Sequence, residues 1–165
     1  MNGHSRFAYI SGALSDMTEE ERTALRSFYE SIARVCNDLH LHAYVPHLVS
    51  DPAKNADLSP HDVDALDREA VTRSALVIAY VGRPSTGVGI EIEMAYHANK
   101  PVIILCEKQI VLSRRLSRLV RGSPAVIKEI LFDDREEATV LLANFLRDAY
   151  LPTKRTDDRP KLLQS

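Results

Sequence analysis

Short apolar runs alternate with stretches of helical periodicity along most of this chain, and this alternation restricts the possible folds more than any other feature. The runs expected to be strands are residues 7–11, 42–46, 75–81 and 102–106, with a fifth in the second half of the ambiguous run 125–132. Strands that alternate with helices form a parallel sheet with right-handed crossovers, so helices cover both faces. The sequence therefore predicts an α/β protein with a doubly wound, five-stranded parallel sheet.

The expected sheet has a defined place for a ligand. Five strands joined in this way fit the flavodoxin-like, or Rossmann-like, arrangement, whose ligand crevice lies at the carboxyl ends of the first and third strands. Two loops rich in Gly, Ser and other polar residues, 12–16 and 83–89, would border that crevice. Residues 1–150 are expected to form one domain, and the charged residues 151–165, which include two prolines, a disordered tail.

Helix starts are indicated by capping residues. Thr18 and Glu21 form a capping box before a long amphipathic pattern. Ser59 precedes a proline in the favoured first helical position, and Ser85 or Thr86 can cap the helix after the third strand.

The remaining segments are less regular. A short helix closed by Gly122 is expected around residues 116–120, and a final amphipathic helix over 136–150. Loops are expected at 107–113 and at 47–58, where the polar segment is long enough to be a functional lid.

Composition excludes several classes of protein. The 165 residues carry a net charge of −2, so the basic footprint of a nucleic-acid-binding protein is missing. No apolar stretch reaches the roughly 20 residues of a membrane-spanning helix, and the polar N-terminus shows no signal peptide. We therefore expect a cytoplasmic protein without nucleic-acid or membrane partners, in which Cys36 and Cys106 are buried thiols. His40, His42 and His47 lack the cysteine or acidic ligands of a metal site, so no metal is predicted.

The strongest functional signal is the segment Pro-Ser-Thr-Gly-Val-Gly-Ile-Glu that begins at Pro84. Gly87 and Gly89 leave the backbone open to a close-lying ligand because neither carries a Cβ, and a helix start favours a bound anion. The segment is not a dinucleotide fingerprint, since Ile92 stands where the third glycine would be. Spacing alone supports a phosphate- or sugar-binding turn and a packing role equally.

Two carboxylates are candidates for chemistry. Glu91 falls about one turn inside the helix, where it can point into the crevice, but an acid there also suits the helix dipole, and spacing leaves both interpretations open. For Glu93 the dipole is the better explanation. Asp67 lies at the rim of an apolar helix face, where spacing alone favours a solvated acid beside Arg68.

The motifs together indicate more than their spacing does. Tyr9-Ile10-Ser11-Gly12, Asp67, residues 84–92 and Lys100-Pro101-Val102 resemble the nucleoside 2-deoxyribosyltransferase superfamily, and within it the 2'-deoxynucleoside 5'-monophosphate N-glycosidases. The motif Pro-Ser-Leu-Gly-Val-Gly-Tyr-Glu-Leu of those N-glycosidases is matched at most of its positions. Residues 116–122 resemble the Leu-Ser-x-Met-Ile-Arg-Gly segment of the same family.

The resemblance implies roles for three residues in catalysis. Glu91 matches the nucleophile that attacks the anomeric carbon and forms a covalent glycosyl-enzyme. Asp67 matches the acid that assists departure of the base, and Tyr9 an active-site tyrosine near the nucleophile. A buried carboxylate suits this reaction because it stabilises and then traps an oxocarbenium-like centre. No metal and no cofactor are implied.

Substrate-binding residues follow from the same resemblance. Ser85 matches a phosphate ligand at the helix start, and Ser117 matches one supplied by the partner subunit of a homodimer. The glycines expected in the site are Gly12, Gly87 and Gly89.

One difference from the family concerns the substrate. The monophosphate N-glycosidases carry Ser and Arg in the loop after the first strand, where this chain has Ala13 and Ser15. An arginine contributes strongly to phosphate binding, so a free nucleoside and a differently substituted nucleotide remain candidate substrates.

The function expected from the resemblance is hydrolysis of the N-glycosidic bond of a (2'-deoxy)ribonucleoside 5'-monophosphate to a free base and a sugar phosphate, in nucleotide metabolism. Three alternatives stay open. These are a nucleoside 2-deoxyribosyltransferase, a glycohydrolase of NAD, and a nucleotide-sensing module that does not catalyse.

Overall fold

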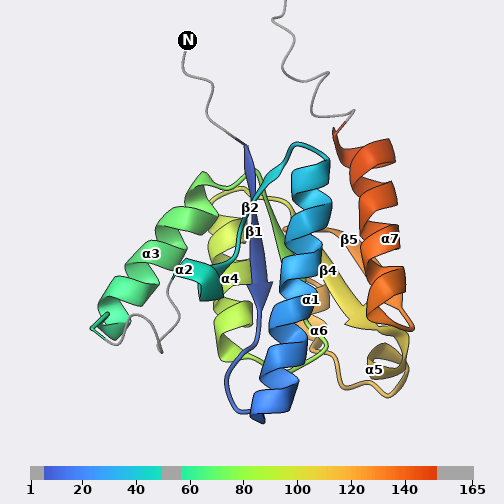
Figure 1. Ribbon diagram of the computed structural model, residues 1–165, viewed down its shortest axis with the longest axis horizontal. Coiled ribbons are helices and arrows are strands. Elements are labelled where there is room, and N and C mark those ends of the chain that lie inside the picture. The colour runs from blue at the N-terminus through green and yellow to red at the C-terminus, as the bar shows by residue number, and fades with distance from the viewer. Residues whose placement is uncertain (1–5, 50–56, 152–165) are drawn as a thin grey trace, which may run out of the picture.

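Five parallel strands form the centre of the molecule, in the order β2-β1-β3-β4-β5 (Figure 1). The computed structural model describes residues 6–49 and 57–151. The strands are β1 (Phe7–Gly12), β2 (His42–Tyr44), β3 (Leu76–Tyr80), β4 (Val102–Glu107) and β5 (Val126–Phe132). This confirms the predicted flavodoxin-like order, and with it the crevice at the carboxyl ends of β1 and β3.

The helices follow the strands along the chain. They are α1 (Glu19–Asp38), α2 (Pro46–Val49), α3 (Pro60–Arg73), α4 (Thr86–His97), α5 (Lys108–Leu112), α6 (Arg118–Arg121) and α7 (Arg135–Phe145), which continues as a π-helical turn, η1 (Leu146–Tyr150). The capping prediction is confirmed at each site. Thr18 and Ser59 both form complete capping boxes, and Ser85 is the N-cap of α4. Among the described residues, none of the helices is long and apolar enough to cross a membrane.

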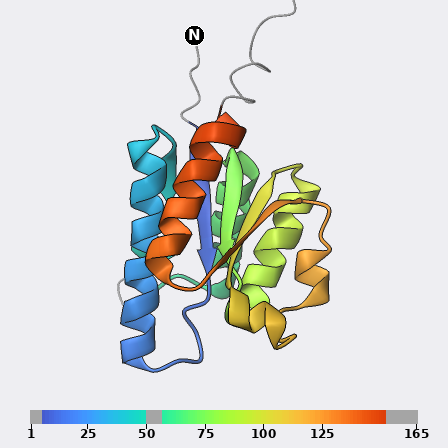
Figure 2. The same cartoon turned by 90° about the vertical axis from the view of Figure 1, so that its right-hand side faces the viewer.

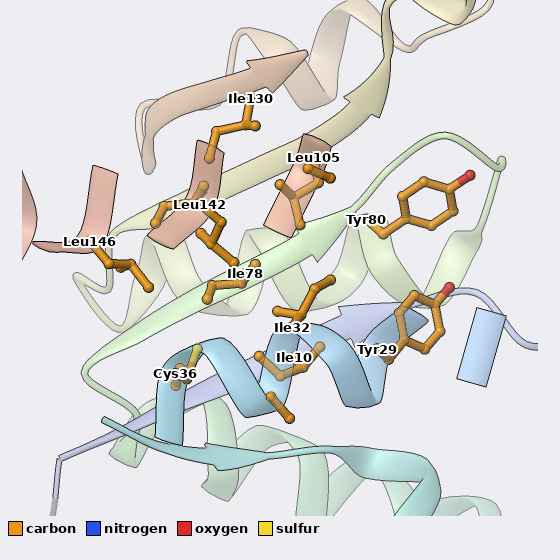
Figure 3. Packing of buried hydrophobic residues seen from close by; sticks show 14 of the residues in the cluster. Ile10, Tyr29, Ile32, Cys36, Ile78, Tyr80, Leu105, Ile130, Leu142 and Leu146 are labelled. Carbon is orange, nitrogen blue, oxygen red and sulfur yellow. The ribbon is translucent and has the colours of Figure 1, made fainter. Parts of the chain in front are cut away.

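The two faces of the sheet carry different helices, as Figure 2 shows with α1 and α7 on one side and α4 on the other. Because side chains alternate along a strand, the even-numbered residues of β1 and β3, such as Ile10 and Ile78, pack under α1 and α7 (Figure 3). The odd-numbered residues, such as Tyr9 and Val77, pack under α3 and α4. This alternation directs Tyr9 toward α4. Cys36 and Cys106 are both buried and free, as predicted.

Three local predictions were wrong. The second strand ends at Tyr44 and not at residue 46, because Pro46 starts α2, and a proline is well suited to a first helical position. Residues 47–49 of the predicted loop 47–58 therefore lie in α2, and residues 50–56 lie outside the described residues. The predicted loop 107–113 contains α5, whose Ile110 and Val111 pack against the core under α4.

The fifth strand is the third element that differs from its prediction. Strand β5 covers the whole of Val126–Phe132 and not only the second half of the run. Its first half is partly exposed, with Ile127 49% accessible, because β5 is an edge strand. This half is a strand because it pairs with β4, and the apolar periodicity of the sequence does not indicate that pairing. Of the predicted tail 151–165, all but Leu151 lies outside the described residues.

The loop after β1 is fixed by a tyrosine from α1. The Tyr29 hydroxyl donates a hydrogen bond to the Ala13 carbonyl oxygen at 2.9 Å. Its ring occupies the space beside Gly12, so that a Cβ at position 12 would lie 2.2 Å from Tyr29 Cζ. Gly12 is therefore required by packing, since only a residue without a side chain allows this approach.

We predict that Gly12→Ala destabilises the protein by about 1–3 kcal/mol, because the added methyl group must displace the buried Tyr29 ring. Gly89→Ala is the matched control. A Cβ there would meet no atom within 4 Å, and alanine in a helix is favoured over glycine by up to ~1 kcal/mol. Urea unfolding of both variants measures the difference, and equal free energies of unfolding would contradict the packing argument.

Candidate active site

A cavity of about 770 Å³ opens at the carboxyl ends of β1 and β3. Residues 12–16 after β1 and the start of α4 form its walls, so the two predicted loops do lie together. Of the residues singled out in the sequence, those that line it are Gly12, Asp67, Ser85, Gly87 and Glu91.

Glu91 is held by two hydroxyl groups of β1. The Tyr9 hydroxyl donates to Oε1 at 2.7 Å, and the Ser11 hydroxyl donates to Oε2. Tyr9 and Ser11 are two positions apart on β1, so both side chains point to the same face of the sheet, and both are 0% exposed. Each carboxylate oxygen of Glu91 therefore has its own buried donor.

The pKa of Glu91 reflects opposing influences. Burial raises it to about 7, because the ionised carboxylate loses hydration. Hydrogen bonds from Ser11 and Tyr9 oppose this effect by stabilising the ionised form, while the nearby charge of Asp67 adds to the rise. Glu91 therefore changes charge near neutral pH, as groups with a chemical role often do.

Asp67 of α3 is the second carboxylate at the cavity. Burial raises its pKa, hydrogen bonding to Tyr9 lowers it, and the charge of Asp64 raises it. The Tyr9 hydroxyl thus interacts with both carboxylates, which together with burial raises the pKa of Tyr9 far above its usual value. Within the described part of the chain, Asp67 Oδ1 is buried without a hydrogen-bond partner. The described residues therefore leave part of the hydrogen-bonding capacity of Asp67 unused.

The Tyr9 ring is kept in place by its neighbour on β2. Tyr9 and Tyr44 are paired across the parallel strands, and their rings stack with centroids 5.5 Å apart and an interplanar angle of 15°. Offset stacking of this kind stabilises a pair of aromatic side chains beyond their burial. The donor to Glu91 is therefore part of a rigid aromatic layer.

Two of the predicted site residues lie elsewhere. Gly89 and Ser117 line a second cavity, of about 880 Å³, between α4 and the segment 110–124. Ser85 lines both cavities. Within one chain, then, Ser117 and Glu91 are on different sides of the α4 start.

Several residues that contact Glu91 or line its cavity were not predicted as site residues. Ser11 appeared only as part of a strand motif, and Arg22, Arg26 and His47 not as site residues. The sequence feature that could have indicated the two arginines is their four-residue spacing, which places both side chains on one face of α1. Arg22 also braces the loop after β1, since its Nε donates to the Leu14 carbonyl oxygen at 3.1 Å.

The carboxylate at position 91 has a predictable effect on stability. Its pKa is about 7 in the folded protein and near 4.5 when exposed, so between those pH values the folded state retains a proton that the unfolded state has lost. Stability then falls as pH rises through this window, at most by about 1.4 kcal/mol per pH unit.

We predict that Glu91→Gln, which cannot ionise, gains stability relative to the wild type by about 2–3 kcal/mol between pH 4.5 and pH 7.5. Chemical denaturation at a series of pH values measures this gap. Glu93→Gln, at an exposed position of the same helix, is the control and should show no comparable trend. If the difference in free energy of unfolding between Glu91→Gln and the wild type does not change with pH, the carboxyl group of Glu91 is not a buried ionisable group.

No family model matches the chain. In sequence, the chain is 28% identical over 130 residues to the "Putative 2'-deoxynucleoside 5'-phosphate N-hydrolase 1" of Syntrophotalea carbinolica, covering 79% of this chain and 82% of that protein.

Solved structures show the same fold. The CMP N-glycosidase BcmB of Clostridium botulinum superposes with a TM-score of 0.62 at 23% identity, over 86% of this chain and 100% of that one. The solution structure of BlsM superposes with a TM-score of 0.69 at 19% identity, over 98% of this chain and 100% of BlsM. The resemblance to a 2'-deoxynucleoside 5'-monophosphate N-glycosidase, predicted from the motifs, is thereby confirmed in sequence, and the two solved structures share the fold.

Proposed function

We propose that this protein is a nucleotide N-glycosidase that hydrolyses (2'-deoxy)ribonucleoside 5'-monophosphates, with Glu91 as the nucleophile. The observation that carries the proposal is the partly buried Glu91 carboxylate, held by Tyr9 and Ser11 at a cavity that also contains Asp67. The similarity to an N-hydrolase and to an N-glycosidase structure supports the same class of reaction.

The two carboxyl groups have complementary roles in this reaction. A Glu91 oxygen attacks the anomeric carbon, and the electron pair of the breaking C–N bond goes to the base, which takes a proton from Asp67. Water then attacks the same carbon, Asp67 takes back a proton, and the Glu91 carboxylate is released with the sugar phosphate. Hydrogen bonding favours this division of charge, because both Glu91 oxygens accept bonds from hydroxyl groups, whereas Asp67 Oδ1 accepts none from the described residues.

The cavity also suits the phosphate of a monophosphate. The start of α4 directs backbone amides into it, and the Ser85 hydroxyl oxygen, which accepts a bond from the Val88 amide at 3.3 Å, still has its own proton to donate. Arg22 and Arg26 of α1 also line the cavity, but Asp16 and Glu19 lie there too, and Arg22 is paired with Glu19 at 2.6 Å. The support for a phosphate is therefore the start of α4 with Ser85, and the base-release assay decides between a nucleotide and a free nucleoside.

The test is chromatographic detection of free base. Purified protein is incubated with deoxyribo- and ribonucleoside monophosphates, the matching nucleosides and NAD. We expect base release from monophosphates, a loss of about 10³-fold or more in Glu91→Gln, and a loss of about 10²–10⁴-fold in Asp67→Asn. Glu136→Gln, at an exposed position of α7 that lines neither cavity, should retain full activity.

Other results would replace the proposal. Release of nicotinamide alone would indicate an NAD glycohydrolase, and formation of a new nucleoside when an acceptor base is added would indicate a transferase. Full activity of Glu91→Gln would refute the assigned nucleophile. Nucleotide binding without any turnover would indicate a sensor.

We also propose that the active protein is a homodimer in which Ser117 is supplied by the partner subunit. The segment that carries Ser117 exposes two large apolar side chains, Leu112 and Leu119, which are 82% and 87% accessible. Exposed apolar groups of this size around a cavity are typical of an interaction surface. Ser117 lies away from Glu91 within one chain, so a second chain is the route by which it could reach the substrate.

Light scattering should therefore give a mass of about twice 18.5 kDa. Leu119→Glu should yield a monomer with greatly reduced base release, because a buried charge disrupts an apolar interface. Val140→Glu changes an exposed apolar residue on α7 and is the matched control, expected to remain dimeric. A monomeric wild type would remove Ser117 from the site.

A further inference from the structure

Ser11 is one of two buried serines among the described residues. Ser11 is 0% exposed and Ser74 is 1% exposed. A buried hydroxyl group needs a hydrogen-bond partner, and the two serines have different ones. Ser74 donates to the Val71 carbonyl oxygen at 2.8 Å, which is a local backbone contact. Ser11 instead donates to the carboxylate of Glu91, which is 80 residues away in the sequence.

We infer that Ser11 is a positioning residue for Glu91, and that its hydroxyl group holds Oε2 so that the carboxylate stays in one orientation and in its ionised form. The consequence for catalysis rests on the proposed function; the contact itself does not. Neither the sequence motifs nor the comparisons assign this role to Ser11.

Two separate donors fix the orientation of the Glu91 carboxylate. Tyr9 binds Oε1 from one side and also interacts with Asp67, so its hydroxyl group is shared between two carboxylates. The Ser11 hydroxyl group instead donates to the other oxygen of Glu91. With Tyr9 alone, the carboxylate could rotate about its terminal bond, which has a broad torsional minimum. The second donor removes that freedom.

The charge of Glu91 depends on the groups around it, and the same cavity is also lined by Asp16, Glu19, Arg22, Arg26 and His47. Tyr9 and Ser11 face it from β1 and Asp67 from α3, and Tyr29 of α1 also interacts with its charge. Burial and Asp67 raise the pKa of Glu91, and of the two groups that lower it Ser11 has the larger effect. Loss of the Ser11 hydroxyl group therefore raises the pKa further and reduces the ionised fraction at neutral pH.

The experiment compares Ser11→Ala and Ser11→Cys with the wild type. A thiol has nearly the shape of the hydroxyl group but is a weak donor, so the effect should increase from Ser through Cys to Ala. The carboxyl carbon of Glu91 is followed by ¹³C NMR against pH, with the signal assigned by its loss in Glu91→Gln. We expect the titration midpoint to rise by about one to two pH units in Ser11→Ala.

Activity gives a second, independent readout. The pH at which kcat/KM for base release declines on the acid side should rise together with the NMR midpoint. Activity at pH 6 should therefore fall by about tenfold or more. Ser74→Ala is the control, because it also removes a buried hydroxyl group with one hydrogen bond but lies outside the Glu91 cavity. It should change neither the midpoint nor the profile.

The outcomes separate this inference from the proposed function. An unchanged Glu91 midpoint in both Ser11 variants would overturn the inference whatever the activity. A raised midpoint in a protein that releases no base would support Ser11 as the residue that holds Glu91 while refuting the N-glycosidase. Should Ser11→Ala fail to fold, the midpoint of the nearly isosteric Ser11→Cys decides.

Discussion

The site depends on keeping one carboxylate charged where water is largely excluded. An unpaired buried charge is costly, and two hydroxyl donors offset that cost at Glu91. Tyr9 and Ser11 come from adjacent inward positions of β1, and the Tyr44 ring keeps Tyr9 in place. A neutral donor stabilises the ionised form without neutralising it. The carboxylate is therefore ready to interact with a carbon atom that develops positive charge.

Helix α4 contributes residues to both cavities. Its N-cap, Ser85, borders both of them, while Glu91 faces one and Gly89 the other. The same element can thus contribute to the reacting centre on one side and to a subunit contact on the other. A substitution at the proposed dimer surface could then alter the Glu91 cavity by moving the start of α4.

Much of this arrangement could be predicted from the sequence, because it depends on local signals. The strand order follows from the alternation of strands and helices, and the start of α4 from Ser85 and the residues around it. Glu91, Tyr9 and Asp67 were identified through the family resemblance, since spacing alone left Glu91 open and favoured a solvated Asp67. The structure places all three together.

The remainder could not be predicted because it is determined by contacts between distant segments. The hydrogen bond from Ser11 to Glu91 requires the register of β1 against β3 and the packing of α4 on both. Arg22 and Arg26 reach the cavity only because α1 passes the loop after β1. The first half of β5 is likewise a strand because β4 lies beside it.

The central claim, that Glu91 forms a bond to the sugar, is tested most directly by trapping that bond. A 2'-fluoro nucleoside monophosphate slows the second step, and mass spectrometry of peptides after acid quenching locates the adduct. We predict one peptide, containing Glu91, with the added mass of the fluorinated sugar phosphate, and no adduct in Glu91→Gln. An adduct on another residue, or rapid release of base with no adduct at any time, would contradict it.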